Sequence, residues 1–209
     1  GDTADLAFFI NHLKQQFPNR PIVAVGFSLG GNVLAKYLGE ENIHCPLNAA
    51  AVISAPYDLS SSSDVIRKSL GKIYQKYLLD RMKKSMRRKL PQIKQQIELT
   101  PEQLMEIDDL WQFDNKLTAP LHGFKDAEDY YFQTKSARKI DTINIPLLII
   151  SARNDPWIPI GAYETIAKDN QKNVTVLSTD GGGHVGFHEK GQVETWYDQQ
   201  IDQFISDLF

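Results

Sequence analysis

A glycine-rich segment near the start of the chain holds the serine that is best placed for covalent chemistry. Residues 26–31 read Gly-Phe-Ser-Leu-Gly-Gly and fit the G-x-S-x-G pattern of a nucleophile elbow, a sharp turn between a strand and a helix. A β-branched run at 21–25 precedes the segment and a helical pattern at 32–38 follows it, so both flanks have the required type. We therefore expect Ser28 to act as a nucleophile once a base removes its proton.

The residues beside Ser28 have expected roles as well. Gly26 and Gly30 lack a Cβ atom, so we expect neighbouring backbone to approach both of them closely. The first N–H groups of the following helix should point toward the site, with the positive end of the helix dipole behind them. The backbone N–H of Leu29 is therefore the candidate oxyanion-hole donor.

An acid and a base follow in the order that the motif predicts. Asp155 comes just after a buried strand at 147–151, and His184 lies in a glycine-rich loop after a strand at 174–178. Triads built on such an elbow have the chain order Ser, Asp, His. The histidine can serve as base and then as acid, while the aspartate would fix its tautomer and stabilise its positive charge.

Two nearby residues are alternatives for these roles. His188 lies four residues after His184, and Asp180 directly precedes the glycines at 181–183. Asp155 could also be only a turn residue, because the sequence Asn-Asp-Pro favours turns. The sequence favours Asp155 and His184 but leaves both alternatives open.

The elements that must position these residues form an α/β pattern. Near-continuous apolar runs predict strands at 21–27, 48–54, 146–151 and 173–178, joined by helical segments. Such runs are typical of parallel strands that helices cover on both faces. We expect the four strands to be parallel neighbours, and the strand that leads to Ser28 to have one unpaired edge.

A segment at about 60–112 shows no strand pattern. Apolar residues recur in it at helical spacing, and Pro91 is expected to interrupt that helix. The four serines at 60–63 indicate a loop or a helix cap, and Thr100 caps another helix. We expect this helical insertion to form a lid or cap with an apolar pocket wall near Ser28.

The insertion also carries a cluster of positive charge. Six basic residues lie close together: Arg81, Lys83, Lys84, Arg87, Arg88 and Lys89. Such a run is usually the solvated face of a helix, but a basic amphipathic helix can also bind a membrane surface. Peripheral membrane contact through this helix therefore stays an open possibility.

Composition bounds the class of protein. The 209 residues are 42% hydrophobic and 23% charged, which is ordinary for one globular domain. The net charge of −3 argues against general nucleic-acid binding. The single cysteine, Cys45, excludes an internal disulfide and favours a reducing, cytoplasmic location. Because the five histidines are scattered, we expect neither a metal nor another cofactor.

Taken together, several blocks resemble a known superfamily. They lie at 26–40, 113–114, 118–124, 130–131, 154–156 and 182–187. The sequence resembles the α/β-hydrolases, and within them the YheT-like branch, which is related to the eukaryotic membrane-anchored abhydrolase lipases. The resemblance implies an α/β-hydrolase fold and a serine hydrolase of carboxylic esters, with lipids among the candidate substrates.

The resemblance also carries an expectation about the extent of the domain. The fold has about four strands before the elbow, whereas the first strand expected here leads directly into it. Residues 1–209 would then be the C-terminal portion of the domain. The N-terminal strands and the loop that supplies a second oxyanion-hole donor would lie outside this sequence.

Three functions remain compatible with these residues. The favoured one is an esterase or lipase that acts through an acyl-enzyme on a small-molecule acyl ester or a lipid. An acyltransferase would pass the same acyl group to an alcohol instead of water. A hydrolase-fold protein that binds a ligand without turnover is the third. The oligomeric state is not predicted.

Overall fold

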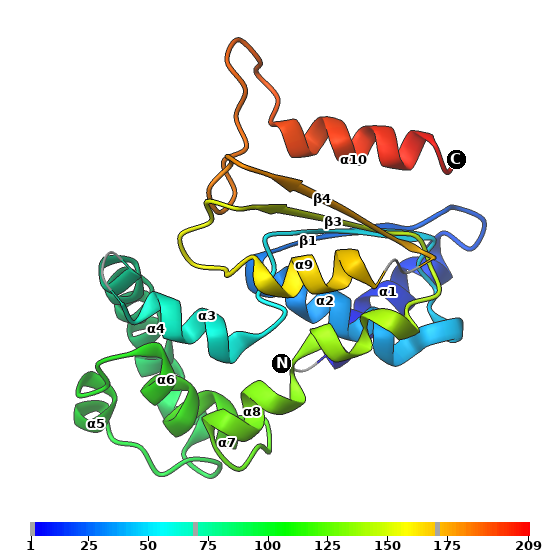
Figure 1. The fold of residues 1–209 in the computed structure, drawn as a ribbon. Coiled ribbons are helices and arrows are strands. Elements are labelled where there is room, and N and C mark those ends of the chain that lie inside the picture. The colour runs from blue at the N-terminus through cyan, green and yellow to red at the C-terminus, as the bar shows by residue number, and fades with distance from the viewer. Residues whose placement is uncertain (1–2, 69–70, 170–171) are drawn as a thin grey trace. The chain divides into compact units, whose positions relative to one another are not determined.

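The computed structural model describes residues 3–68, 71–169 and 172–209 (Figure 1). Contacts divide the chain into two compact units. An α/β unit comprises residues up to 58 together with 135–209, and a helical unit comprises residues 59–134. The helical unit thus extends beyond the expected insertion at about 60–112, and its role as a lid or cap stays a prediction.

The α/β unit is built on a four-stranded parallel sheet. The strands are β1 (Val23–Phe27), β2 (Ala49–Ile53), β3 (Leu147–Ala152) and β4 (Val174–Thr179). They pair in the order β1-β2-β3-β4, and every pairing is parallel. The predicted α/β fold with a parallel sheet is confirmed. Among the described residues β1 pairs only with β2, so it forms one edge of the sheet as expected.

Helices cover both faces of this sheet. In Figure 1 α10 (Trp196–Ser206) lies on one side of the strands, and the other helices of the unit lie on the opposite side. These other helices are α1 (Ala4–Gln16), α2 (Ser28–Glu41), α9 (Gly161–Lys168) and the short 3-10 segments η1 (Asn42–His44) and η3 (Ser136–Thr142).

The central strands are apolar on both faces. Ala50 and Val52 of β2 belong to the core on the α2 side, whereas Ala51 and Ile53 pack in the core with α10. All five residues of β2 are buried. This two-sided burial explains why the strand reads as a continuous apolar run rather than as an alternating one.

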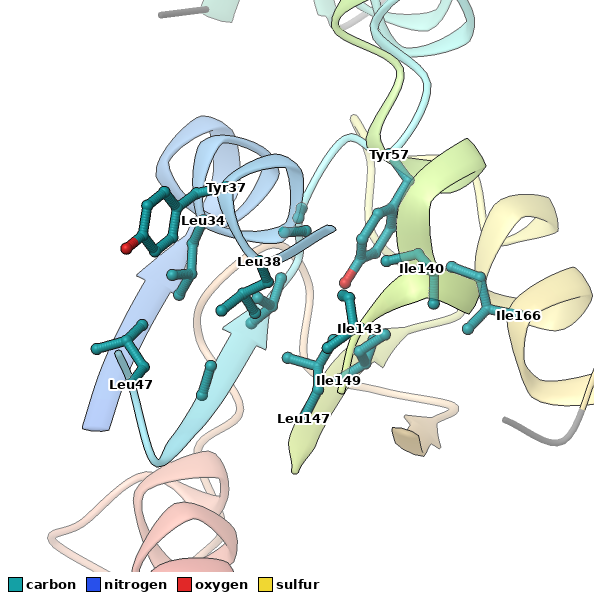
Figure 2. Packing of buried hydrophobic residues seen from close by; sticks show 14 of the residues in the cluster. Leu34, Tyr37, Leu38, Leu47, Tyr57, Ile140, Ile143, Leu147, Ile149 and Ile166 are labelled. Carbon is teal, nitrogen blue, oxygen red and sulfur yellow. The ribbon is translucent and has the colours of Figure 1, made fainter. Parts of the chain in front are cut away.

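The larger core lies between the sheet and α2. Figure 2 shows Leu34 and Leu38 of α2 beside the strands, with Ile149 of β3 nearby and Ile140 of η3 completing the cluster. All four side chains are buried. Burying such a side chain contributes about 1.5–3 kcal/mol, so this core holds α2, and with it Ser28, against the sheet.

The helical unit has a core of its own. Its helices are α3 (Leu59–Ile66), α4 (Gly71–Ile93), α5 (Pro101–Met105), α6 (Leu110–Phe113), α7 (Ala119–Leu121) and α8 (Ala127–Gln133). A π-helical segment, η2 (Asp114–Thr118), joins α6 to α7. One cluster of its buried apolar residues consists of Leu79, Leu90, Leu104, Ile107, Phe113 and Leu117. A second cluster consists of Ala119, Tyr130 and Tyr131. No helix in the described ranges is long and apolar enough to cross a membrane.

A partly buried carboxyl group links two segments of the helical unit. Asp114 Oδ1 accepts a hydrogen bond from Thr118 Oγ1 at 2.7 Å, and Oδ2 accepts one from Tyr131 OH at 2.8 Å. Burial raises the pKa of Asp114, and the hydrogen bonds from the two hydroxyl groups offset part of that rise. The contact joins η2 to α8.

Two local predictions in the helical unit were wrong. Pro91 does not interrupt α4, which continues to Ile93. Because the proline lies in the final turn and Leu90 beside it is buried in the core, the cost to the helix is confined to its end. The serines at 60–63 lie within α3 rather than in a loop or at a helix cap, and two of them, Ser62 and Ser63, are buried there.

Candidate active site

Ser28 occupies a sharp turn at the carboxyl end of β1. The strand ends at Phe27 and α2 begins at Ser28 itself. Ser28 has a φ of 49°, in the left-handed region that a residue with a side chain seldom adopts. Strain of this kind costs about 1–3 kcal/mol and is concentrated at functional sites. The strand, turn and helix predicted from the sequence are all present.

Close packing at the turn depends on two glycines. A Cβ atom on Gly26 would lie 2.8 Å from Gly31 Cα, and one on Gly31 would lie 2.9 Å from Val52 Cγ1. The expectation for Gly26 is therefore confirmed. The expectation for Gly30 was wrong, because a Cβ atom there would meet nothing within 4 Å beyond its chain neighbours and the backbone of its own helix. Gly31, three residues after Ser28, is the glycine that faces β2.

His184 lies between the serine and the aspartate. Its Nε2 atom is 2.9 Å from Ser28 Oγ, and its Nδ1 atom is 2.8 Å from Asp155 Oδ2. The side chains of His184 and Asp155 are only 8% and 3% exposed. With Nδ1 protonated, the histidine donates to the carboxylate and Nε2 can accept the serine proton.

Asp155 also accepts hydrogen bonds from its own loop. Its Oδ1 atom accepts from the backbone N–H groups of Trp157 at 2.9 Å and Ile158 at 3.1 Å. A buried carboxylate requires such partners. The loop therefore fixes one carboxylate oxygen and leaves the other for His184.

Two residues that sequence reasoning missed link the aspartate loop to the histidine loop. Asn154 Oδ1 accepts a hydrogen bond from the backbone N–H of Gly183 at 2.8 Å, directly before His184. The Trp157 ring contacts the His184 ring edge-on, with centroids 4.8 Å apart. The sequence signal for both was their position beside Asp155: Asn154 begins the tripeptide Asn-Asp-Pro, and Trp157 directly follows it.

The alternative residues do not contact this group. Asp180 is 99% exposed at its side chain and lies 3.5 Å from Arg153 in an ion pair. His188 lines a separate cavity of about 310 Å³ together with Glu189 and Trp196. The structure brings together Ser28, His184 and Asp155 and leaves both alternatives outside.

The Leu29 backbone lies in the first turn of α2. Because α2 starts at Ser28, the N–H groups of its first turn have no carbonyl partner within the helix. The positive end of the dipole of this 14-residue helix is at the same place. This environment suits an anionic oxygen, and the oxyanion role of Leu29 stays a prediction. No three potential metal-ligand side chains gather anywhere in the described part of the chain.

Comparison with known proteins identifies the family. Residues 1–191 match the family described as the alpha/beta hydrolase fold. YheT of Escherichia coli (strain K12), an esterase by its name, is 36% identical over 189 residues, which cover 90% of this chain and 55% of YheT. A monoacylglycerol lipase of Saccharomyces cerevisiae is 32% identical over 213 residues, covering 98% of this chain and 46% of the lipase.

A solved structure shares the fold. An esterase of Pyrococcus furiosus matches with a TM-score of 0.58 at 17% identity, over 99% of this chain and 61% of the esterase. The chain spans about half the length of the two curated relatives described above. The match over most of its length shows that this chain belongs to the alpha/beta hydrolase fold family, and its similarity to YheT confirms the YheT-like resemblance.

Proposed function

We propose that the protein hydrolyses carboxylic esters through Ser28, His184 and Asp155. The observation that carries the proposal is the hydrogen-bonded series from Ser28 Oγ through both ring nitrogens of His184 to Asp155 Oδ2. A nucleophile within hydrogen-bond reach of a base, with a third group that orients the base, is the arrangement that covalent acyl transfer requires.

In the proposed reaction His184 Nε2 takes the proton of Ser28 as Oγ attacks the ester carbonyl carbon. The tetrahedral intermediate then expels the alcohol, which receives that proton from His184, and an acyl group remains on Ser28. A water molecule, deprotonated by His184, attacks the acyl group, so the carboxylic acid leaves and Ser28 regains its proton. Asp155 stabilises the imidazolium at both stages.

The oxyanion would form beside the start of α2. The Leu29 N–H and the dipole of α2 favour negative charge at this place. Loss of one oxyanion-hole donor typically costs about 10²–10³-fold in kcat.

Acyl esters, with lipids among them, are the proposed substrates. The names of the relatives support this class, since YheT carries the word esterase in its name and another relative is named monoacylglycerol lipase. If an apolar pocket holds the acyl chain, each added CH₂ should raise kcat/KM by up to about fourfold, which corresponds to about 0.8 kcal/mol. A series of p-nitrophenyl esters from acetyl to medium chains measures this, and a flat series would contradict an apolar pocket.

Covalent labelling tests the nucleophile directly. A fluorophosphonate probe should label the intact protein, and Ser28→Ala should abolish the labelling. His184→Ala should lower both labelling and ester hydrolysis by about 10⁴-fold or more, because the three residues act as a unit. Ser206→Ala, at an exposed serine of α10, is the matched control and should leave both unchanged. Absence of labelling at Ser28 in the intact protein would favour a binding protein without turnover.

A further inference from the structure

Helix α4 concentrates positive charge in a chain whose net charge is negative. Its one acidic residue is Asp80, against the basic residues Lys72, Lys76, Arg81, Lys83, Lys84, Arg87, Arg88 and Lys89. The chain as a whole carries −3. Lys83 does not belong to the surface, because it is only 7% exposed and its Nζ atom donates to the Met105 carbonyl at 2.9 Å. The other seven basic side chains of α4 are exposed.

Apolar residues share the exposed side of α4 with these cations. Ile73 is 72% exposed and Tyr77 is 53% exposed. Ile73, Tyr77, Arg81, Lys84 and Arg88 follow one another at spacings of three or four residues, so they lie along one face of the helix. We call these five residues the α4 face. The guanidinium of Arg81 lies 4.6 Å from the centre of the Tyr77 ring, which places a cation directly against an exposed aromatic side chain.

The charges of the α4 face are not neutralised by neighbouring carboxylates. Among the described residues the one ion pair within α4 joins Lys76 to Asp80 at 3.2 Å. No carboxylate of a described residue lies within 4 Å of the charged groups of Arg81, Lys84 or Arg88. The face therefore offers three unpaired cations to a partner.

We infer that the α4 face binds the surface of a membrane that contains anionic lipids. We choose an anionic membrane as the partner because of charge complementarity: clustered Lys and Arg side chains on an amphipathic helix are attracted to anionic headgroups. Ile73 and Tyr77 favour a bilayer over a nucleic acid, since an exposed aliphatic side chain and a tyrosine can enter the interfacial layer between headgroups and acyl chains. The inference is independent of the proposed hydrolysis.

Vesicle sedimentation tests this surface with the intact protein. We expect binding to phosphatidylcholine vesicles that contain phosphatidylserine to be at least about tenfold tighter than to pure phosphatidylcholine vesicles. Raising the salt from about 0.1 M to about 1 M should remove most of that difference, because the Debye length falls from about 10 Å to about 3 Å.

Matched variants assign the binding to this helix. The triple change R81E/K84E/R88E should weaken binding to the anionic vesicles by at least about tenfold. The triple change R20E/K168E/K190E makes the same charge difference at exposed positions of the α/β unit and should bind as the unchanged protein does. The pair Ile73→Ser and Tyr77→Ser should weaken binding several-fold without altering charge, and circular dichroism checks that each variant is folded.

Several outcomes would overturn the inference. Equal binding to the two kinds of vesicle would remove the role of charge, and equal weakening by the two triple changes would remove the role of α4. Binding of duplex DNA by the α4 face, without binding of vesicles, would assign the surface to a nucleic acid. Ser28→Ala should bind vesicles normally, so a failed esterase assay and a failed vesicle assay are separate results.

Discussion

Each unit of the molecule encloses an aspartate, and the two differ in their hydrogen-bond donors. Asp155 in the α/β unit accepts from two backbone N–H groups and from a histidine. Asp114 in the helical unit accepts from two hydroxyl groups, those of Thr118 and Tyr131. Backbone donors fix a carboxylate in one orientation and leave an oxygen for the histidine. The two hydroxyl donors hold two helical segments together through the Asp114 carboxyl group. We therefore expect a change of Asp155 to lower the rate of ester hydrolysis and a change of Asp114 to alter the stability of the helical unit.

The largest effect should come from Asp155→Asn. The amide keeps the shape of the side chain but cannot stabilise an imidazolium, so kcat for ester hydrolysis should fall by about 10⁴-fold. Steady-state kinetics of the intact protein measures the loss. Asp114→Asn is the matched control and should change kcat by less than about threefold, since Asp114 is not part of the Ser28, His184 and Asp155 group and its substitution should act mainly on stability. Similar losses in both variants would remove the distinction between the two aspartates.

Asn154→Ala should have the next largest effect on the reaction. Without the hydrogen bond to Gly183, the histidine loop can shift, and a displacement of about 1 Å can lower the rate by about 10²-fold. We expect kcat to fall by about 10–100-fold with little change in KM. Asn154→Asp keeps an acceptor oxygen and should recover most of the rate. Failure of Asp to do better than Ala would show that this hydrogen bond does not position His184.

Tyr131→Phe should act on stability rather than on catalysis. The change removes one of the two donors to Asp114, and loss of a hydrogen bond to a buried charged group costs about 1–3 kcal/mol. Urea unfolding should show a lower midpoint for the transition of the helical unit. Tyr77→Phe removes the hydroxyl of an exposed tyrosine in the same unit and should leave the midpoint unchanged. A lowered midpoint in both variants would mean that the contact with Asp114 is not the cause.

The smallest expected effect is a pH dependence of the helical unit. Burial raises the pKa of Asp114 above its ordinary value of 3.8, so the folded state favours the protonated group. The stability that this preference supplies is fully present below pH about 3.8 and is lost as the pH rises through the folded-state pKa. Unfolding measured across the acid range should show this decline, and Asp114→Asn should remove it. An unchanged decline in the variant would assign it to another group.

Features with a local signal could be predicted from the sequence. The four strands were predicted because each is a short, mostly apolar run, although only β2 and β3 are buried along their whole length. The elbow was predicted because its glycines lie between a strand and a helix. The order of Ser28, Asp155 and His184 was sufficient to select residues that the structure brings together. Chain order is informative here because each of the three residues follows a parallel strand, and the carboxyl ends of parallel strands lie at one edge of the sheet.

Features that depend on contacts between distant segments could not be predicted. Which glycine of the pair Gly30 and Gly31 faces β2 depends on the rotation of α2 about its axis, which only packing determines. The bond from Gly183 to Asn154 joins loops that follow different strands. Lys83 belongs to a basic run in the sequence, yet it is buried against the carbonyl of Met105 because that side of α4 packs in the unit's core.

The position of β1 at the edge of the sheet affects how the chain should behave in solution. Among the described residues one side of β1 has no strand partner, and Val25 and Phe27 on this strand are exposed. An open strand edge with apolar side chains is a template for intermolecular pairing. We therefore expect the 209-residue chain on its own to self-associate as its concentration rises, and a lysine at position 25 to improve its colloidal stability.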